Sequence, residues 1–195
     1  MSNIGKYINN ITYINLDKRP DRKKEIEEEL TKMGLSGERF AAIEHTVGIA
    51  GCGMSHLAVL KDAKAKGYKN ILVLEDDFQF IVDRTTFEKE LEGFFALNIP
   101  YDVLMLSYNC RNINPYNAIV SRATNAQTTS GYIVHERFYD TLIRIWEEGL
   151  QKFIPLDICW KSLQPSSQWF LMNTRIGIQR ESYSDIEQKI VNYKV

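Results

Sequence analysis

The stretch that most constrains the fold is Asn70–Asp77, with the sequence NILVLEDD. Its apolar residues 71–74 include β-branched members and no polar break, which is typical of a central strand buried on both faces. Three carboxylates follow at once: Glu75, Asp76 and Asp77. Adjacent carboxylates repel one another unless a positive charge lies among them, and ligands of open α/β sheets bind at this end of the strands. The triplet therefore predicts a hard divalent cation with oxygen ligands or, as the plainer alternative, a solvated turn.

The beginning of the chain predicts a second group of polar residues at a strand end. Residues 11–16 (ITYINL) are typical of a strand, and a helix is expected from Pro20 to about Met33. Four side chains are expected at the carboxyl end of this strand, beside the ligand: Asn15, Asp17, Arg19 and Arg22. Arginine offers a phosphate two parallel donors, so the two arginines are interpreted as phosphate contacts or, equally, as ordinary surface charges.

The glycine-rich segment 51–56 (GCGMSH) is expected to lead into a helix over residues 57–67. It does not match the dinucleotide-binding pattern GxGxxG, because His56 occupies the position of the third glycine. We expect a flexible approach to the helix, whose N-terminal amides and Ser55 hydroxyl face a site. For His56, a structural hydrogen-bonding role and a direct chemical role both stay open.

Strands and helices alternate through the first half of the chain, which predicts a mainly parallel α/β sheet covered by helices on both faces. Residues 1–195 are expected to form a single domain, because no repeat, linker or low-complexity tract interrupts them. Further strands are expected over residues 39–43, 78–82, 102–107, 118–122, 132–134, 169–172 and 175–179, and further helices over 85–97, 135–149 and 158–163.

The second half contributes further candidates for a site. Ser130 and Tyr132 belong to a hydroxyl-rich turn that offers hydrogen bonds to a ligand. Asp157 is a candidate general base, with a plain helix N-cap as the equally open alternative, and Asp185 is a weaker candidate.

Charge and cysteine content limit the partners. The formal net charge of −1 gives no basic field for nucleic acid. No apolar run approaches a transmembrane length, and no secretory signal is recognisable. The three cysteines form no CxxC pair, so we expect reduced thiols in the cytoplasm, with peripheral membrane association left open, and no zinc site. The acidic triplet favours Mn²⁺ or Mg²⁺.

Four blocks in order, YINLDKRPDR, GCGMSHLAVL, ILVLEDD and TSGYIV, resemble glycosyltransferase family 25, which includes lipopolysaccharide and collagen galactosyltransferases. The later segments PLD and GIQRESYSDI also resemble that family, so the similarity spans residues 11–186. The resemblance implies a GT-A fold and inversion at the anomeric carbon. It also implies a nucleotide-sugar donor, usually a UDP-hexose and here UDP-galactose or UDP-glucose, and a glycan or protein hydroxyl as acceptor.

The resemblance assigns the metal-binding motif to the triplet. Glu75 and Asp77 are the expected ligands, because alternate residues of an extended segment point the same way, and Asp76 is expected to face the hydroxyls of the ribose or of the sugar. Two other classes of protein are alternatives to this glycosyltransferase. A sugar nucleotidyltransferase would normally carry a glycine-rich loop after the first strand, where this chain has DKRPDR. A binding protein that has lost turnover is the other, and the retained triplet argues against it.

Overall fold

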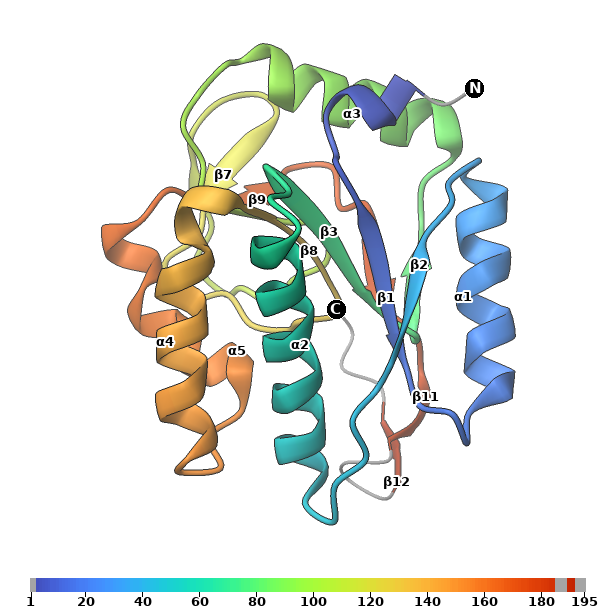
Figure 1. Ribbon diagram of the computed structural model, residues 1–195. Coiled ribbons are helices and arrows are strands. Elements are labelled where there is room, and N and C mark those ends of the chain that lie inside the picture. The colour runs from blue at the N-terminus through green and yellow to red at the C-terminus, as the bar shows by residue number, and fades with distance from the viewer. Residues whose placement is uncertain (1–2, 185–188, 192–195) are drawn as a thin grey trace.

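A computed structural model describes residues 3–184 and 189–191 of the chain. Its centre is an eight-stranded sheet with the strand order β2-β1-β3-β8-β5-β9-β7-β6 (Figure 1). The strands of this sheet are β1 (Ile11–Asn15), β2 (Glu38–Ala41), β3 (Asn70–Glu75), β5 (Val103–Met105), β6 (Asn114–Pro115), β7 (Val120–Arg122), β8 (Gly131–His135) and β9 (Trp169–Met172). Two small antiparallel pairs accompany it, β4 (Phe78–Phe80) with β10 (Gly177–Gln179), and β11 (Ser182–Ser184) with β12 (Lys189–Val191).

Six of the eight strands run in one direction, which confirms the mostly parallel sheet predicted from the sequence. β1 pairs in parallel with both β2 and β3, and β5 pairs in parallel with β9. β8 is antiparallel to both of its neighbours, β3 and β5, and β7 is antiparallel to β9 and β6. The carboxyl ends of β1, β2 and β3 therefore meet at one edge, where open α/β sheets bind their ligands.

Helices cover both faces of the sheet (Figure 1). The helices are α1 (Pro20–Lys32), α2 (Gly48–Ala65), α3 (Arg84–Ala96), α4 (Tyr139–Leu150) and α5 (Leu156–Cys159), with short 3₁₀ turns at Asn3–Lys6, Glu136–Phe138, Trp160–Ser162 and Gln164–Ser166. Apolar residues of α1 and α3 form the core on one face, and those of α2 and α4 form the core on the other. None of the helices in the described ranges is long and apolar enough to span a membrane.

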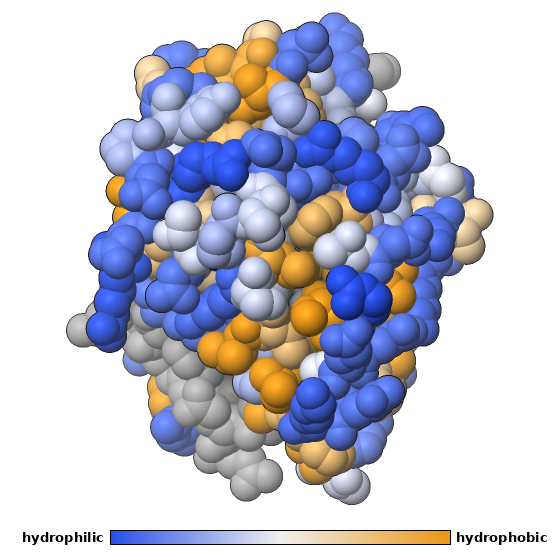
Figure 2. Space-filling view, turned by 90° about the vertical axis from the view of Figure 1, so that its left-hand side faces the viewer, coloured by the Kyte–Doolittle hydropathy of each residue, from blue (hydrophilic) through white to orange (hydrophobic). Residues whose placement is uncertain are grey.

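Strand β3 is buried on both faces, as its unbroken apolar run predicts. Leu72 and Leu74 pack into the core beneath α1 and α3, whereas Ile71 and Val73 pack beneath α2 and α4. All four are at most 1% exposed, so the strand holds the acidic triplet at the end of a rigid element. On the face shown in Figure 2, hydrophilic residues predominate around smaller hydrophobic patches.

Helix α2 begins earlier than the sequence predicts, and the expected flexible approach does not exist. Gly51 and Gly53 lie inside the helix, which starts at Gly48. A Cβ atom on Gly51 would meet the Ile43 carbonyl oxygen at 2.7 Å, and one on Gly53 would meet Leu150 at 2.5 Å. The two glycines therefore allow close packing of α2, and the tertiary contacts outweigh the low helix propensity of glycine.

Candidate functional site

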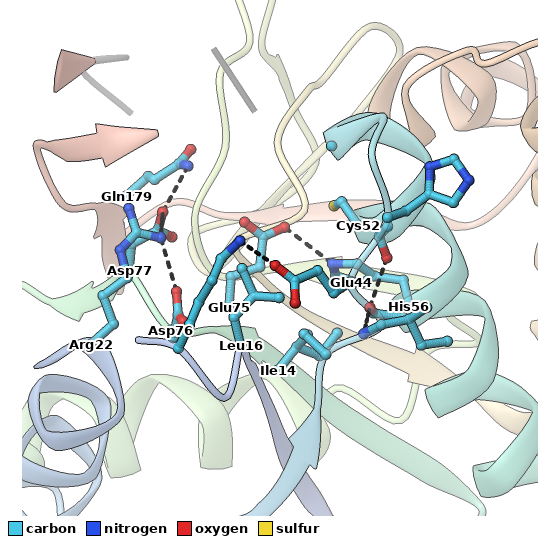
Figure 3. A pocket seen from close by; sticks show the side chains of 17 residues that line it. Ile14, Leu16, Arg22, Glu44, Cys52, His56, Glu75, Asp76, Asp77 and Gln179 are labelled. Atoms are coloured by element: carbon cyan, nitrogen blue, oxygen red, sulfur yellow. Dashed lines mark hydrogen bonds and ion pairs between the residues drawn. The ribbon is translucent and has the colours of Figure 1, made fainter. Parts of the chain in front are cut away.

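A pocket lies at the carboxyl ends of β1, β2 and β3. Its walls come from residues at and just after the ends of these strands, from the first turns of α2 and from Gln179 of β10. The three acids of the triplet line it together with Arg22. Figure 3 shows two groups of side chains here. Asp76, Asp77, Arg22 and Gln179 form one group, and Cys52, His56 and Glu75 form the other.

The two aspartates of the triplet share one arginine. Arg22 Nη1 lies 3.0 Å from Asp76 Oδ1 and 3.3 Å from Asp77 Oδ2, and all three side chains are about 90% buried. Asn15 Nδ2 donates to Asp76 Oδ2 at 2.7 Å, and Gln179 Nε2 donates to Asp77 Oδ2 at 3.2 Å. Arg22 therefore supplies part of the positive charge that was expected among the carboxylates.

Glu75 points to a different partner. Its Oε1 atom lies 3.1 Å from His56 Nε2 and accepts a hydrogen bond of 2.5 Å from the Thr129 hydroxyl. Desolvation alone would raise the pKa of Glu75, but the hydrogen bonds and the nearby imidazole bring it below its usual value. Glu75 is therefore held as a carboxylate.

The single positive charge of Arg22 does not fully neutralise the two aspartates, Asp76 and Asp77. Burial, reinforced by the charge of Glu75, raises the pKa of Asp77 to about 7 despite the nearby Arg22. Burial also raises the pKa of Asp76. The second oxygen of Asp77, Oδ1, is buried and has no hydrogen-bond partner in the described part of the chain. A buried carboxylate oxygen without a donor is costly, so one more positive ligand at Asp77 would stabilise the site.

The expected arrangement of the triplet is wrong in one respect. Alternation would put Glu75 and Asp77 together and Asp76 apart, but Asp76 and Asp77 share Arg22 while Glu75 contacts His56. The reason is that the strand ends at Glu75, and a tight turn at residues 76–77 leads into β4. A turn does not follow the two-residue alternation of a strand.

Of the other residues predicted from the first β-α unit, one belongs to the site and two do not line the pocket. Asn15 is 1% exposed and binds Asp76, so it belongs to the site. Arg19, whose side chain is partly buried, pairs with its exposed neighbour Asp21, and the exposed Asp17 pairs with the partly buried Arg39. In this structure Arg19 and Asp17 make ion pairs with these residues and do not line the pocket.

Ser55 and His56 lie in the interior of α2. The expectation that the helix begins beside them is therefore wrong, because its first residue is Gly48. The Ser55 hydroxyl donates to the Gly51 carbonyl oxygen and accepts from the Ile43 amide, so neighbouring backbone occupies it. His56 is fully buried, and its Nδ1 atom lies 2.7 Å from the Tyr132 hydroxyl. Tyr132 therefore contacts His56, which itself lines the pocket.

Ser130 is fully buried, and its hydroxyl lies 2.6 Å from that of Ser107. Asp157 is not an N-cap, because α5 begins one residue earlier, after Pro155. Its carboxylate instead accepts a hydrogen bond of 3.4 Å from the Thr128 amide, and burial raises its pKa. Asp185 lies outside the described residues.

Sequence reasoning missed the second group of the pocket. The ligand atoms of Cys52, His56 and Glu75 all lie within 4.8 Å of one another. The signal was present in the sequence, because Cys52 and His56 are four residues apart and therefore share a helix face. All three cysteines, Cys52, Cys110 and Cys159, are free thiols in this structure.

Two solved structures are similar to this chain in three dimensions. A crystal structure of a glycosyltransferase involved in glycosylation of the major capsid of PBCV-1 superposes with a TM-score of 0.58 and 12% sequence identity, covering 92% of this chain and 95% of that one. The structure of A197 from STIV superposes with a TM-score of 0.49 and 13% identity, covering 94% and 98%. The first of these establishes the GT-A type of fold and not the reaction.

One sequence relative is a much longer protein. The human protein named inactive glycosyltransferase 25 family member 3 is 24% identical over 148 residues. The aligned region covers 61% of this chain and 24% of the human protein, so the chain spans about a quarter of that relative. No protein-family model matches the sequence. The chain thus has the fold of a glycosyltransferase and a weak sequence similarity to a member of glycosyltransferase family 25.

Proposed function

We propose that the protein is an inverting family 25 glycosyltransferase that moves galactose or glucose from a UDP-sugar to a hydroxyl of a glycan or protein, with Mn²⁺ or Mg²⁺. The unpartnered oxygen of Asp77 carries this proposal. It lies in a pocket at the carboxyl ends of the parallel strands, among three carboxylates that one arginine only partly neutralises.

The residues of the triplet fit a divalent cation. Asp77 offers a buried oxygen without a donor, and hard cations take carboxylate oxygens. Asp77 would hold the ion, together with Asp76 or Glu75. When bound, the ion would neutralise the charge that develops on the departing diphosphate. Arg22, already in the pocket, would then be available to the same diphosphate as a second positive group.

The pocket wall supplies the remaining contacts of the donor. Ile14, Leu16 and Ile43 form an apolar side, which suits the flat face of a nucleoside base. Asn15 fixes the carboxylate of Asp76 at 2.7 Å, so that its orientation is set before a ligand arrives. A carboxylate that is oriented in advance favours stabilisation of a developing charge.

Asp157 is proposed as the general base that removes the proton of the acceptor hydroxyl. Its raised pKa brings it closer to neutrality, where a base works best. The negative charge of Glu75 contributes to that raised pKa, so the two carboxylates interact electrostatically. The proton would pass from the acceptor oxygen to the Asp157 carboxylate while that oxygen attacks the anomeric carbon.

A specific observation favours a second candidate function. The human relative is named as inactive, so a protein that binds a nucleotide sugar or glycan without turnover is the alternative to the enzyme. The two differ in one result, because the binding protein would retain UDP-sugar affinity and release no UDP.

The experiment measures UDP release across a panel of UDP-sugars and acceptors, in Mn²⁺ and in EDTA. The enzyme predicts release in Mn²⁺ that is lost in EDTA and in Asp77→Ala, and kept in Asp62→Ala, which alters an exposed aspartate of α2. UDP release that survives both EDTA and Asp77→Ala would mean that the reaction needs no metal ion. Binding without release on every acceptor would favour the alternative.

A further inference from the structure

The second group of the pocket has a donor set unlike that of the acidic triplet. Cys52 and His56 stand one turn apart on α2, and Glu75 faces them from the end of β3. Figure 3 shows the three side chains converging on the pocket, away from the group around Asp77. Sulfur, imidazole nitrogen and carboxylate oxygen are the three ligand types that Zn²⁺ takes in proteins.

We propose that Cys52, His56 and Glu75 form a binding site for a thiophilic divalent cation such as Zn²⁺. The ligand atoms lie within 4.8 Å of one another, whereas two ligands of a tetrahedral zinc ion are about 3.5 Å apart. Metal binding therefore requires these atoms to move by about 1 Å, and Glu75 and Cys52, which are only partly buried, have the room to do so. On binding, the thiol proton of Cys52 leaves to solvent and a sulfur–metal bond replaces it.

The surroundings of the site already orient its ligands. His56 Nδ1 lies 2.7 Å from the Tyr132 hydroxyl, which leaves Nε2 directed at Glu75. The Thr129 hydroxyl donates to Glu75 at 2.5 Å. Metal-binding imidazoles and carboxylates are normally held in this way by a second hydrogen bond. All three ligands line the pocket, so a metal ion held by them would be reached from it.

The site has a consequence for the triplet that rests on the proposed function. Glu75 is common to both donor sets, so a cation held by Cys52 and His56 draws this carboxylate away from Asp77. Zn²⁺ is therefore expected to inhibit the Mn²⁺-dependent reaction from within the donor pocket.

The test does not depend on that reaction. Metal-free, reduced protein is titrated with Co²⁺, a spectroscopic substitute for Zn²⁺, and the near-ultraviolet band of a thiolate–cobalt bond is recorded. We expect the band to saturate at one Co²⁺ per chain and to vanish when Zn²⁺ is added. Cys52→Ser should abolish it, and Glu75→Gln should weaken Co²⁺ affinity at least tenfold.

The other cysteines provide matched controls. Cys110→Ser and Cys159→Ser remove partly buried thiols that lie outside the cluster, and both variants should keep the band. Cys52→Ala serves as a second variant, and far-ultraviolet circular dichroism establishes that each variant is folded. Absence of the band in the wild-type protein, or its persistence in folded Cys52→Ser or Cys52→Ala, would overturn the proposal. Failure of UDP release alone would leave this result unaffected.

Discussion

Replacing Asp77 by asparagine should stabilise the metal-free protein at alkaline pH. The folded environment raises the pKa of Asp77 from 3.8 to about 7, chiefly by burial. Between these two pH values the folded state holds a proton that the unfolded state has lost, so stability falls as pH rises. About three pH units at about 1.4 kcal/mol each give a cost of about 4 kcal/mol, complete above pH 7. The amide of the replacement is neutral in both states and avoids this cost.

The assay is urea unfolding followed by tryptophan fluorescence, in EDTA, at pH 4, 6 and 8. The advantage of Asp77→Asn should grow from almost nothing at pH 4 to about 4 kcal/mol at pH 8. Asp140→Asn, which alters an exposed aspartate of α4, controls for the same chemical change outside the pocket. With Mn²⁺ at about 100 times its dissociation constant, the wild-type protein should gain about 2.7 kcal/mol and the variant nothing.

Two results would refute this reasoning. If Asp77→Asn destabilises the protein at pH 8 in EDTA, the carboxylate is adequately compensated by Arg22 and needs no cation. If the difference in unfolding free energy between the wild type and Asp77→Asn does not change with pH, ionisation of Asp77 does not destabilise the folded state.

Three further predictions concern the neighbours of the triplet. Arg22→Gln should destabilise the protein in EDTA by about 3–5 kcal/mol, because it leaves buried carboxylates unpaired, and Mn²⁺ should restore part of the melting temperature, whereas restoration by NaCl alone would argue against a specific site. Asp157→Asn should abolish sugar transfer while UDP affinity by calorimetry stays unchanged, and normal turnover would remove this residue as the base. Tyr132→Phe should cost about 1–3 kcal/mol in urea unfolding because it leaves His56 Nδ1 without its partner, and an unchanged midpoint would mean that the hydrogen bond contributes nothing.

The sequence predicts most of the sheet because its signals are local. The run 71–74 is apolar throughout, and such a run has to be buried on both faces wherever it lies. Helix α1 follows the spacing of Ile26, Leu30 and Met33, all of which are buried. The early start of α2 could not be predicted, because glycine disfavours helices and only the packing against Ile43 and Leu150 reverses that preference.

The site is less accessible to sequence reasoning because its contacts are long-range. The acidic triplet can be recognised from three adjacent letters, and its position at the end of a buried strand is confirmed. The arginine that meets Asp76 and Asp77 lies 54 and 55 residues earlier in the chain, and nothing in its local pattern separates it from Arg19. The direction of each carboxylate depends on the turn after Glu75, whose geometry a pattern of polar residues does not specify.

The most direct test of the account is a crystal structure of the protein soaked with UDP and Mn²⁺, with anomalous scattering used to locate the metal. We predict one manganese peak in contact with Asp77 Oδ1 and with the diphosphate of UDP, with the nucleotide in the pocket beside β1 and α2. A structure that holds UDP with no manganese at the triplet, and with Arg22 still bound to both aspartates, would contradict the claim that these acids are metal ligands.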